Sequence, residues 1–129
     1  MATVTATLTD DGRNLIREAL RGSGNAQVRY IAIGTSTTSP STSDHKLGSE
    51  VLRKQVTSIT DGTTAGEIIA SIYIGAGDAV GVTIEEIGAF AGPSATTTRD
   101  TGVMLARALW HHADKAPTES IITQLDIII

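Results

Sequence analysis

The chain contains no cysteine, which excludes a disulfide scaffold, an iron–sulfur cluster, a Cys-based zinc site and a thiol nucleophile. Aromatic residues are almost as scarce, at 3% of the sequence, although 40% of the residues are hydrophobic. The core must therefore be built from aliphatic side chains. This composition, with Thr, Ser and Gly between the apolar runs, favours β-structure.

Basic residues and long hydrophobic runs are also in short supply. Ten Lys and Arg stand against 14 Asp and Glu, giving a formal net charge of −4, whereas binding of nucleic acid normally needs a basic surface. No apolar run approaches the roughly 20 residues of a membrane-spanning helix, and residues 1–10 do not resemble a signal peptide. We expect a soluble single domain, 1–129, with no nucleic-acid or membrane partner and no secretion signal.

Hydrophobic periodicity predicts one helix followed by strands. Apolar residues recur at helical spacing over 10–21, with Thr9 placed to cap the helix and Gly22 to end it. Residues 3–8 alternate as a short extended arm or edge strand would. Period-two segments bounded by turn residues follow at 27–33, 52–59, 66–74, 82–90, 103–110 and 118–129. The predicted fold is mainly β (α+β), with one N-terminal helix packed on an antiparallel β-sandwich of about six strands.

The connections between these segments are of two kinds. Residues 61–62 and 75–78 are short and glycine-containing, as in hairpin turns, and the glycines of 75–81 do not have the spacing of a dinucleotide-binding loop. Residues 34–44 and 92–102 are longer and polar, and are expected to be surface loops. No repeated crossover helix is predicted.

Few residues have the arrangement that catalysis or metal binding requires. His112 and Asp114 match half of a two-histidine, one-carboxylate iron site, but no histidine follows them, and His111 points to the other face of the strand. Glu85 and Glu86 also alternate in direction. Glu86 falls on the more apolar face, where a carboxylate needs a partner such as Arg53 or Arg107; alternatively, a bulge near Gly88 lets both glutamates reach solvent. We predict no catalytic, cofactor or metal site.

Contact with other chains is the function that the remaining residues favour. One candidate is the helix, on which three arginines recur every four residues, although the same stripe could simply be a solvated flank. Another is the C-terminal strand, which is apolar on both faces and would leave an adhesive surface in a lone monomer unless it is a covered central strand. The predicted subunit or partner interface comprises Arg13, Arg17, Arg21, Trp110, Ile127, Ile128 and Ile129.

Three segments in this order resemble the N-terminal domain of bacteriophage tail fibre (tail-collar fibre) proteins. The first reads L-x-x-E-x-x-R, at Leu47, Glu50 and Arg53. The second is the strand G-V-T-I-E-E-I-G-A-F at 81–90, and the third is the turn K-A-P at 115–117. The resemblance spans about residues 8–120.

The resemblance implies a virion structural domain, non-enzymatic and without cofactors, which attaches a fibre or accessory protein to the baseplate or tail. Its partners would be further copies of itself, as a trimer by analogy with fibres, and other virion proteins. It would be located in the virion tail, and in the host cytoplasm during assembly. Since family members usually continue into a shaft and a receptor-binding tip, this chain would be an attachment or adaptor module. The alternatives are a capsid decoration or head-fibre protein, and a small metal-dependent enzyme using His111, His112 and Asp114.

Overall fold

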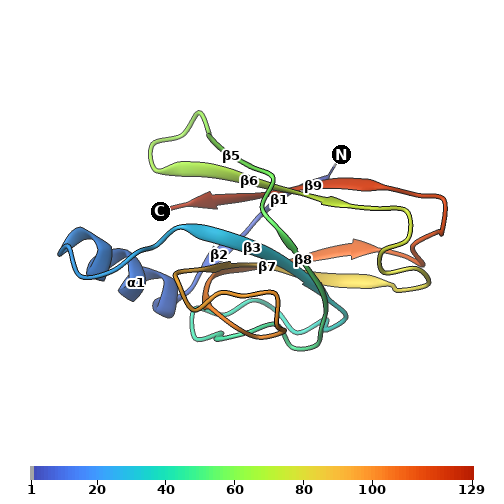
Figure 1. Cartoon of the computed structure of the whole chain (residues 1–129), viewed down its shortest axis with the longest axis horizontal. Helices are drawn as coiled ribbons and strands as arrows, with labels where there is room; N and C mark the ends of the chain where they lie inside the picture. The colour runs from blue at the N-terminus through green and yellow to red at the C-terminus, as the bar shows by residue number, and fades with distance from the viewer. Residues whose placement is uncertain (1) are drawn as a thin grey trace.

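The structure, a computed structural model, describes residues 2–129, which form two stacked β-sheets and one helix (Figure 1). Sheet A contains, in spatial order, β1 (Ala2–Thr5), β9 (Ile121–Ile128), β6 (Glu67–Ile74) and β5 (Ser58–Asp61). Sheet B contains β2 (Thr7–Leu8), β8 (Val103–His112), β7 (Ile84–Ala91), β3 (Val28–Gly34) and β4 (Glu50–Gln55). The predicted mainly β fold with one N-terminal helix is confirmed.

Two extended segments pass from one sheet to the other. In the first, β1 pairs with β9 in sheet A and β2 pairs with β8 in sheet B, with Ala6 between them. In the second, the Val56 amide donates to the Arg29 carbonyl beside sheet B, whereas the next amide, of Thr57, donates to the Ser71 carbonyl of sheet A. Figure 1 shows this green segment crossing in front of the sandwich. Each crossing divides one predicted segment into two strands, so the structure has more strands than the six expected.

The pairing differs from the prediction in two further respects. β1 runs parallel to β9, whereas every other pair of neighbouring strands is antiparallel. The turn at 61–62 does join a hairpin, because β5 pairs with β6. The turn at 75–78 does not, because β6 lies in sheet A and β7 lies in sheet B. It is a local turn, closed by the Asp78 amide on the Gly75 carbonyl at 3.0 Å, that connects the two sheets.

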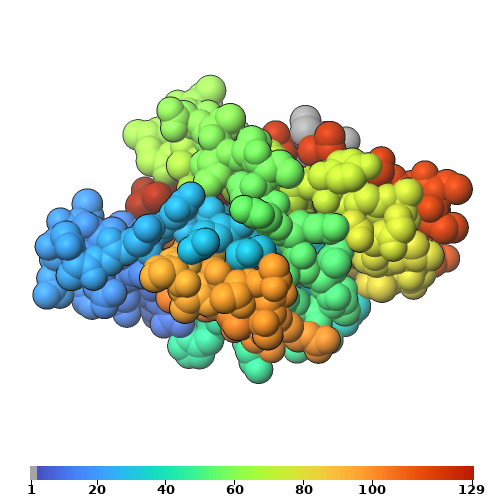
Figure 2. All heavy atoms as spheres, in the orientation of Figure 1, coloured from blue at the N-terminus to red at the C-terminus, as the bar shows by residue number. Residues whose placement is uncertain are grey.

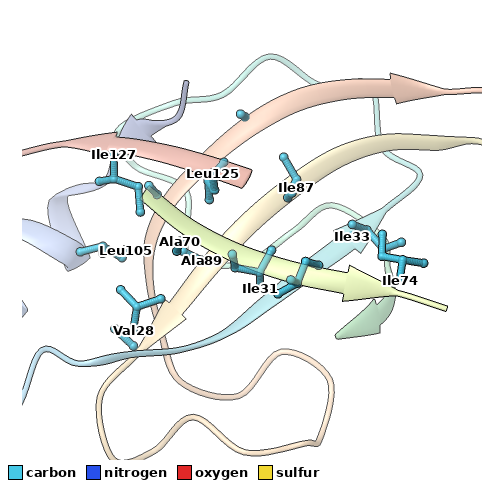
Figure 3. Packing of buried hydrophobic residues seen from close by; sticks show 14 of the residues in the cluster. Val28, Ile31, Ile33, Ala70, Ile74, Ile87, Ala89, Leu105, Leu125 and Ile127 are labelled. Carbon is cyan, nitrogen blue, oxygen red and sulfur yellow. The ribbon is translucent and has the colours of Figure 1, made fainter. Parts of the chain in front are cut away.

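The main core fills the space between the sheets (Figure 3). Alternation along each strand directs one set of side chains inward. From sheet A these include Ala70, Ile74, Leu125 and Ile127, and from sheet B Val28, Ile31, Ile33, Ile87, Ala89 and Leu105. The core is aliphatic, as the composition requires.

The helix α1 (Asp10–Leu20) closes one end of the molecule and packs on β8 (Figures 1 and 2). Thr9 caps it, because its hydroxyl accepts from the Gly12 amide at 2.9 Å and donates to the Met104 carbonyl of β8 at 2.5 Å. Gly12 lets the helix approach closely, since a Cβ there would clash with the Leu105 backbone. The predicted cap and helix are confirmed, and Gly22 follows the end of the helix with a φ of 80°.

A second, smaller core lies on the outer face of sheet B. It consists of Ala32, Leu47, Phe90, Ala95 and Met104, with Tyr30 packed against it. Leu47 comes from the loop at 35–49 and Ala95 from the loop at 92–102, so these two loops cover this face of the sheet. The polar segments predicted to be surface loops are therefore attached to sheet B through buried residues in or next to them, Leu47 for the first loop and Ala95 for the second.

Candidate functional site

The carboxylate of Glu86 lies at the centre of the outer face of sheet B and is fully buried. Its Oε2 accepts the amides of Ser36 and Ser49 at 3.0 and 2.8 Å, and its Oε1 accepts the amide of Gly48 at 2.9 Å. Arg107 completes the set, with Nε 3.1 Å from Oε1. One side chain of β7 thus binds both ends of the loop at 35–49.

Arg107 extends this contact to the middle of the same loop. Its guanidinium is almost completely buried, and Nη1 lies 3.3 Å from Oδ2 of Asp44. The same Asp44 oxygen accepts the amide of Ser41 at 2.8 Å. The prediction that Glu86 would need an arginine partner is confirmed for Arg107. The alternative in which both glutamates reach solvent is wrong for Glu86.

A second buried ion pair holds the loop at 92–102. Arg53 forms a two-point contact with Glu50, with Nε on Oε2 and Nη2 on Oε1, both at 2.8 Å. Its third nitrogen, Nη1, donates to the carbonyls of Thr96 and Thr101 at 2.9 and 3.0 Å. The guanidinium lies 4.5 Å from the centre of the Phe90 ring, close enough for a cation–π contact. Arg53 therefore joins β4 and the strand β7 to this loop.

These five charged residues, Asp44, Glu50, Arg53, Glu86 and Arg107, are called the anchoring network below. The network also requires the glycine at 34, because a Cβ there would clash with the Glu86 carboxylate and the Ser49 carbonyl. Each arginine uses its planar, multi-donor head to contact one carboxylate and further acceptors at once. Each charged group of the network has a partner of opposite charge, although Nη2 of Arg107, 3.1 Å from Oε1 of Glu86, is buried without a hydrogen bond in the described residues.

The motif residues that suggested a family resemblance converge on this network. Glu50 and Arg53 form one ion pair, Glu86 belongs to the other, and Leu47 packs in the small core above Gly88. The third motif lies apart from them. Lys115 is buried and donates through Nζ to the carbonyls of Ala76 and Ala116 at 3.2 and 3.3 Å, which holds the turn at 75–78 against the β8–β9 connection.

The histidines are separated, each with its own carboxylate. Nδ1 of His111 lies 2.8 Å from Oε1 of Glu85, and Nε2 of His112 lies 3.0 Å from Oε1 of Glu119. The contact with His112 lowers the pKa of Glu119. Asp114 is exposed and does not join either pair. Across residues 2–129, no three His, Asp or Glu residues gather as a metal-binding group would require.

His45 lies near the helix, in the loop at 35–49. Its Nδ1 is 2.5 Å from Oδ2 of Asp11, and this hydrogen bond raises the pKa of His45 above its ordinary value. These two residues border a surface hollow of about 410 Å³ beside α1. The hollow is lined by Asp11, Asn14, Leu15, Glu18, His45, Gly102, Val103 and Met104, and is called the helix hollow below.

The arginines of the predicted interface are where the helical spacing places them. Arg13, Arg17 and Arg21 all lie exposed on the solvent side of α1 and are called the arginine stripe. Nη1 of Arg13 lies 3.9 Å from Oδ1 of Asp10, which is a long distance for an ion pair. Beside the stripe, Leu20 is 85% exposed, the most exposed of the large hydrophobic residues in the described part of the chain. Sequence reasoning included Leu20 in the helix pattern but did not recognise that it points outward.

The remaining predicted interface residues do not form one surface. Ile127 is fully buried between the sheets, as Figure 3 shows, so its inclusion in an interface is corrected. The reason is strand alternation, which directs Ile127 inward and Ile128 outward. Ile128 and Ile129 are about half exposed, whereas Trp110 packs partly buried against the main core. β9 is also not an edge strand, because β1 and β6 flank it.

The outer face of sheet A carries two small apolar patches. Tyr73 and Ile122 lie opposite each other on β6 and β9, and both are 50% exposed. Ile128 and Ile129 lie at the other end of β9, toward α1 (Figure 1). Two acids lie beside the second patch, with Glu67 on β6 opposite Ile128 and Asp126 two residues before Ile128 on β9; they share a hydrogen bond that raises the pKa of Asp126. The alternation of 118–129 contained the signal for Ile122, but only the pairing with β6 brings Tyr73 beside it.

Comparison of the sequence with protein-family models gives no match, and comparison with curated proteins gives none either. The helix α1, with 11 residues, is not long and apolar enough to cross a membrane, and no other helix in residues 2–129 could do so.

Proposed function

We propose that the chain is a non-enzymatic structural component of a bacteriophage virion, associated with the tail or baseplate as a fibre or fibre-adaptor protein. The observation that carries the proposal is the anchoring network. Two of the three motifs that resemble tail-fibre proteins contain charged residues that hold two polar loops against sheet B. Such use of charge suits a rigid module that presents surfaces to other chains.

The surface offers regions for such contacts. The anchored loops at 35–49 and 92–102 present exposed Ser and Thr side chains in a restrained conformation. The outer face of sheet A presents Tyr73 and Ile122, together with Ile128 and Ile129 from the predicted interface. We assign to these surfaces the contacts with other virion proteins, and to further copies of the chain the self-association that the resemblance implies.

The test is to locate the chain in particles. An antibody raised against the purified protein would be used for immunogold electron microscopy of phage produced by the source host. We expect gold at the tail or baseplate. Labelling of the head would replace the proposal with the alternative of a capsid decoration or head-fibre protein, and the absence of label from intact and detergent-opened particles would refute a virion role.

A further inference from the structure

We infer that the outer face of sheet A is a docking surface for a partner protein whose contact surface carries an arginine or lysine beside apolar side chains. The inference deepens the proposed function, since it names the partner's chemistry on a surface to which that proposal assigns contacts, and it rests on that proposal. Three features of the face support it, namely its exposed apolar side chains, its lack of bases and a pair of carboxyl groups with an unpartnered oxygen.

The outward-pointing residues of β6 and β9 form four rows across the two central strands of sheet A. The register of the two strands pairs Tyr73 with Ile122 in the first row, Ser71 with Gln124 in the second, Ile69 with Asp126 in the third and Glu67 with Ile128 in the fourth. The first and third rows are four residues apart along a strand, a separation of roughly 13 Å. One end of the face is therefore apolar, and the other end combines carboxyl groups with isoleucine side chains.

The apolar side chains of this face are available to a partner. Tyr73 and Ile122 lie opposite each other and are each 50% exposed, and Ile128 is 44% exposed. The helix hollow differs in this respect, because its apolar lining is largely buried and its aspartate is already paired with a histidine. A partner would therefore gain apolar contact on sheet A that the hollow does not offer.

The charges of sheet A are all of one sign. The chain has ten Lys and Arg, but none occurs in the four strands of this sheet, at 2–5, 58–61, 67–74 and 121–128. Neither Glu67 nor Asp126 forms an ion pair with a base in the described residues. An acidic and apolar face is complementary to a basic and apolar one, and a second sheet A does not supply the bases.

The carboxyl pair is the place at which a cation would bind. Glu67 accepts the amide of Thr64 at 3.0 Å, and its hydrogen bond with Asp126 requires a proton on one of the two acids. Oδ1 of Asp126 is buried without a hydrogen-bond partner in the described residues. Thr5 and Ile69 face Asp126 from β1 and β6 and do not titrate, which leaves Glu67 as its charged neighbour. The head of an arginine or lysine can replace the shared proton, since it is positively charged and donates several hydrogen bonds at once.

Docking of such a cation should release a proton. The hydrogen bond with Glu67 raises the pKa of Asp126 in the free protein, whereas a cation beside the pair favours the ionised carboxylate and lowers that pKa. Affinity must then rise with pH over the range in which free Asp126 still holds its proton. We expect the increase between about pH 4 and pH 7.

The probe for this surface is a cyclic β-hairpin peptide with leucine and arginine four residues apart on one strand, which matches the separation of the first and third rows. Its control carries citrulline, an uncharged isostere of arginine, at the same position. NMR titration of the full chain with each peptide, up to millimolar concentration, is carried out at pH 4 and pH 7. We expect signals of β6 and β9 to shift, and the arginine peptide to bind roughly tenfold more tightly than the citrulline peptide at pH 7. The difference should be much smaller at pH 4.

Variants of the chain distinguish the carboxyl pair from the rest of the face. Asp126→Asn cannot ionise, so it should bind the arginine peptide at pH 7 about as weakly as the unmodified protein does at pH 4. Ile122→Thr should weaken the binding of both peptides roughly fivefold, because apolar contact is lost. Asp100→Asn is the control, since it removes one negative charge from an exposed position in the loop at 92–102, and it should change neither affinity. Circular dichroism would confirm that each variant is folded.

The outcomes separate this inference from the proposed function. Equal affinity of the two peptides, shifts confined to residues outside sheet A, or no shift at millimolar peptide would each overturn the inference. Broadening of the same β6 and β9 signals as the protein alone is concentrated would show that a second copy, with its arginine stripe as the source of bases, occupies the face, and would overturn the assignment to another protein. Immunogold labelling is independent of these results. Particles without label would refute the virion role even if the peptide binds, and a labelled tail without peptide binding would refute the inference alone.

Discussion

Glu67 and Asp126 are two acids that lie beside each other on adjacent strands of sheet A, so ionisation of one carboxyl group disfavours ionisation of the other. Glu67 accepts the amide of Thr64 at 3.0 Å, which lowers its pKa. Asp126 has its pKa raised, first by the hydrogen bond with Glu67 and then by burial. One Asp126 oxygen, Oδ1, is buried with no hydrogen-bond partner in the described residues. Asp126 is therefore the member of the pair that favours the protonated state.

The raised pKa of Asp126 predicts an unusual dependence of stability on pH. A carboxyl whose pKa is higher in the folded state stabilises the fold when it is protonated, so its contribution is lost as pH rises through that folded-state pKa. Asp126→Asn keeps the hydrogen bond to Glu67 without requiring a proton. We expect the variant to have a higher Tm than the unmodified protein at pH 7, with the difference shrinking as pH falls toward 4.

Thermal unfolding followed by circular dichroism at pH 4 and pH 7 measures this difference. Asp61→Asn, an exposed carboxylate on the neighbouring strand β5, is the matched control and should leave Tm nearly constant. A lower Tm for Asp126→Asn at pH 7 would show that the ionised form of Asp126 supports the fold.

At the scale of elements, the strands of sheet B serve as a base to which loops are tied by charge. β7 supplies Glu86, β8 supplies Arg107 and β4 supplies Glu50 and Arg53. A buried ion pair of this kind contributes little compared with apolar packing of the same volume, but removal of one partner leaves the other unpaired in a low-dielectric site. Each of the loops at 35–49 and 92–102 should therefore be rigid while the ion pairs of the anchoring network that hold it are intact, and should loosen when one member is lost.

Glu86→Gln tests this dependence, because it preserves shape and removes charge. The new amide group faces backbone N–H donors and leaves Arg107 without a full counter-charge, so we expect a loss of about 3–5 kcal/mol in the free energy of unfolding. Urea unfolding measures the loss, and limited proteolysis should show faster cleavage within residues 35–49. Glu85→Gln, on the same strand but partly exposed and paired with His111, should cost less than about 1 kcal/mol. Equal losses in the two variants would contradict the anchoring role.

Some elements of the structure could be predicted from the sequence and others could not. Helical spacing of apolar residues predicted the helix, and strand alternation with the apolar runs predicted the strand positions and the class of fold, because each depends on local periodicity. Alternation also placed Glu86 on a buried face, and burial of a carboxylate implied an arginine. It could not select the loop amides of Ser36, Gly48 and Ser49, since these reach Glu86 only when the loop at 35–49 folds back over sheet B.

The sequence also did not reveal to which of the two sheets a strand belongs. Residues 52–59 read as one strand because their periodicity continues, but the backbone changes hydrogen-bond partner between Val56 and Thr57. The turn at 75–78 has hairpin composition, yet its two strands belong to different sheets. Ile127 and Ile128 were both assigned to an interface because an apolar pattern on both faces does not say which face the core takes. These outcomes depend on contacts distant in sequence.

At the scale of the whole molecule, both sides of the sandwich are bordered by segments that change sheets. On one side this is residues 2–8, and on the other it is residues 50–61. On the first side, β1 covers the backbone edge of β9, a strand rich in isoleucine. An uncovered strand of this composition offers free hydrogen-bonding groups to other chains and is prone to aggregate.

Deletion of residues 2–5 removes this cover and should make the protein aggregate through β9. We expect rising light scattering and thioflavin T fluorescence during incubation at 37 °C, compared with a stable signal for the unmodified chain. The double variant Thr3→Ala with Thr5→Ala retains the β1 backbone and is the control, since only the side chains change. A soluble deletion variant with unchanged Tm would mean that β1 does not protect β9.

The place of β9 also determines the order in which the protein can fold during synthesis. β9 lies between β1 and β6, both of which precede it in the chain, so neither β1 nor the β5–β6 hairpin has this sheet partner until residues 121–128 leave the ribosome. Sheet B, whose strands are all complete by residue 112, can pair earlier. The nascent chain must therefore carry one face of its core uncovered until β9 has been synthesised, and in this period a chaperone would find most apolar surface to bind.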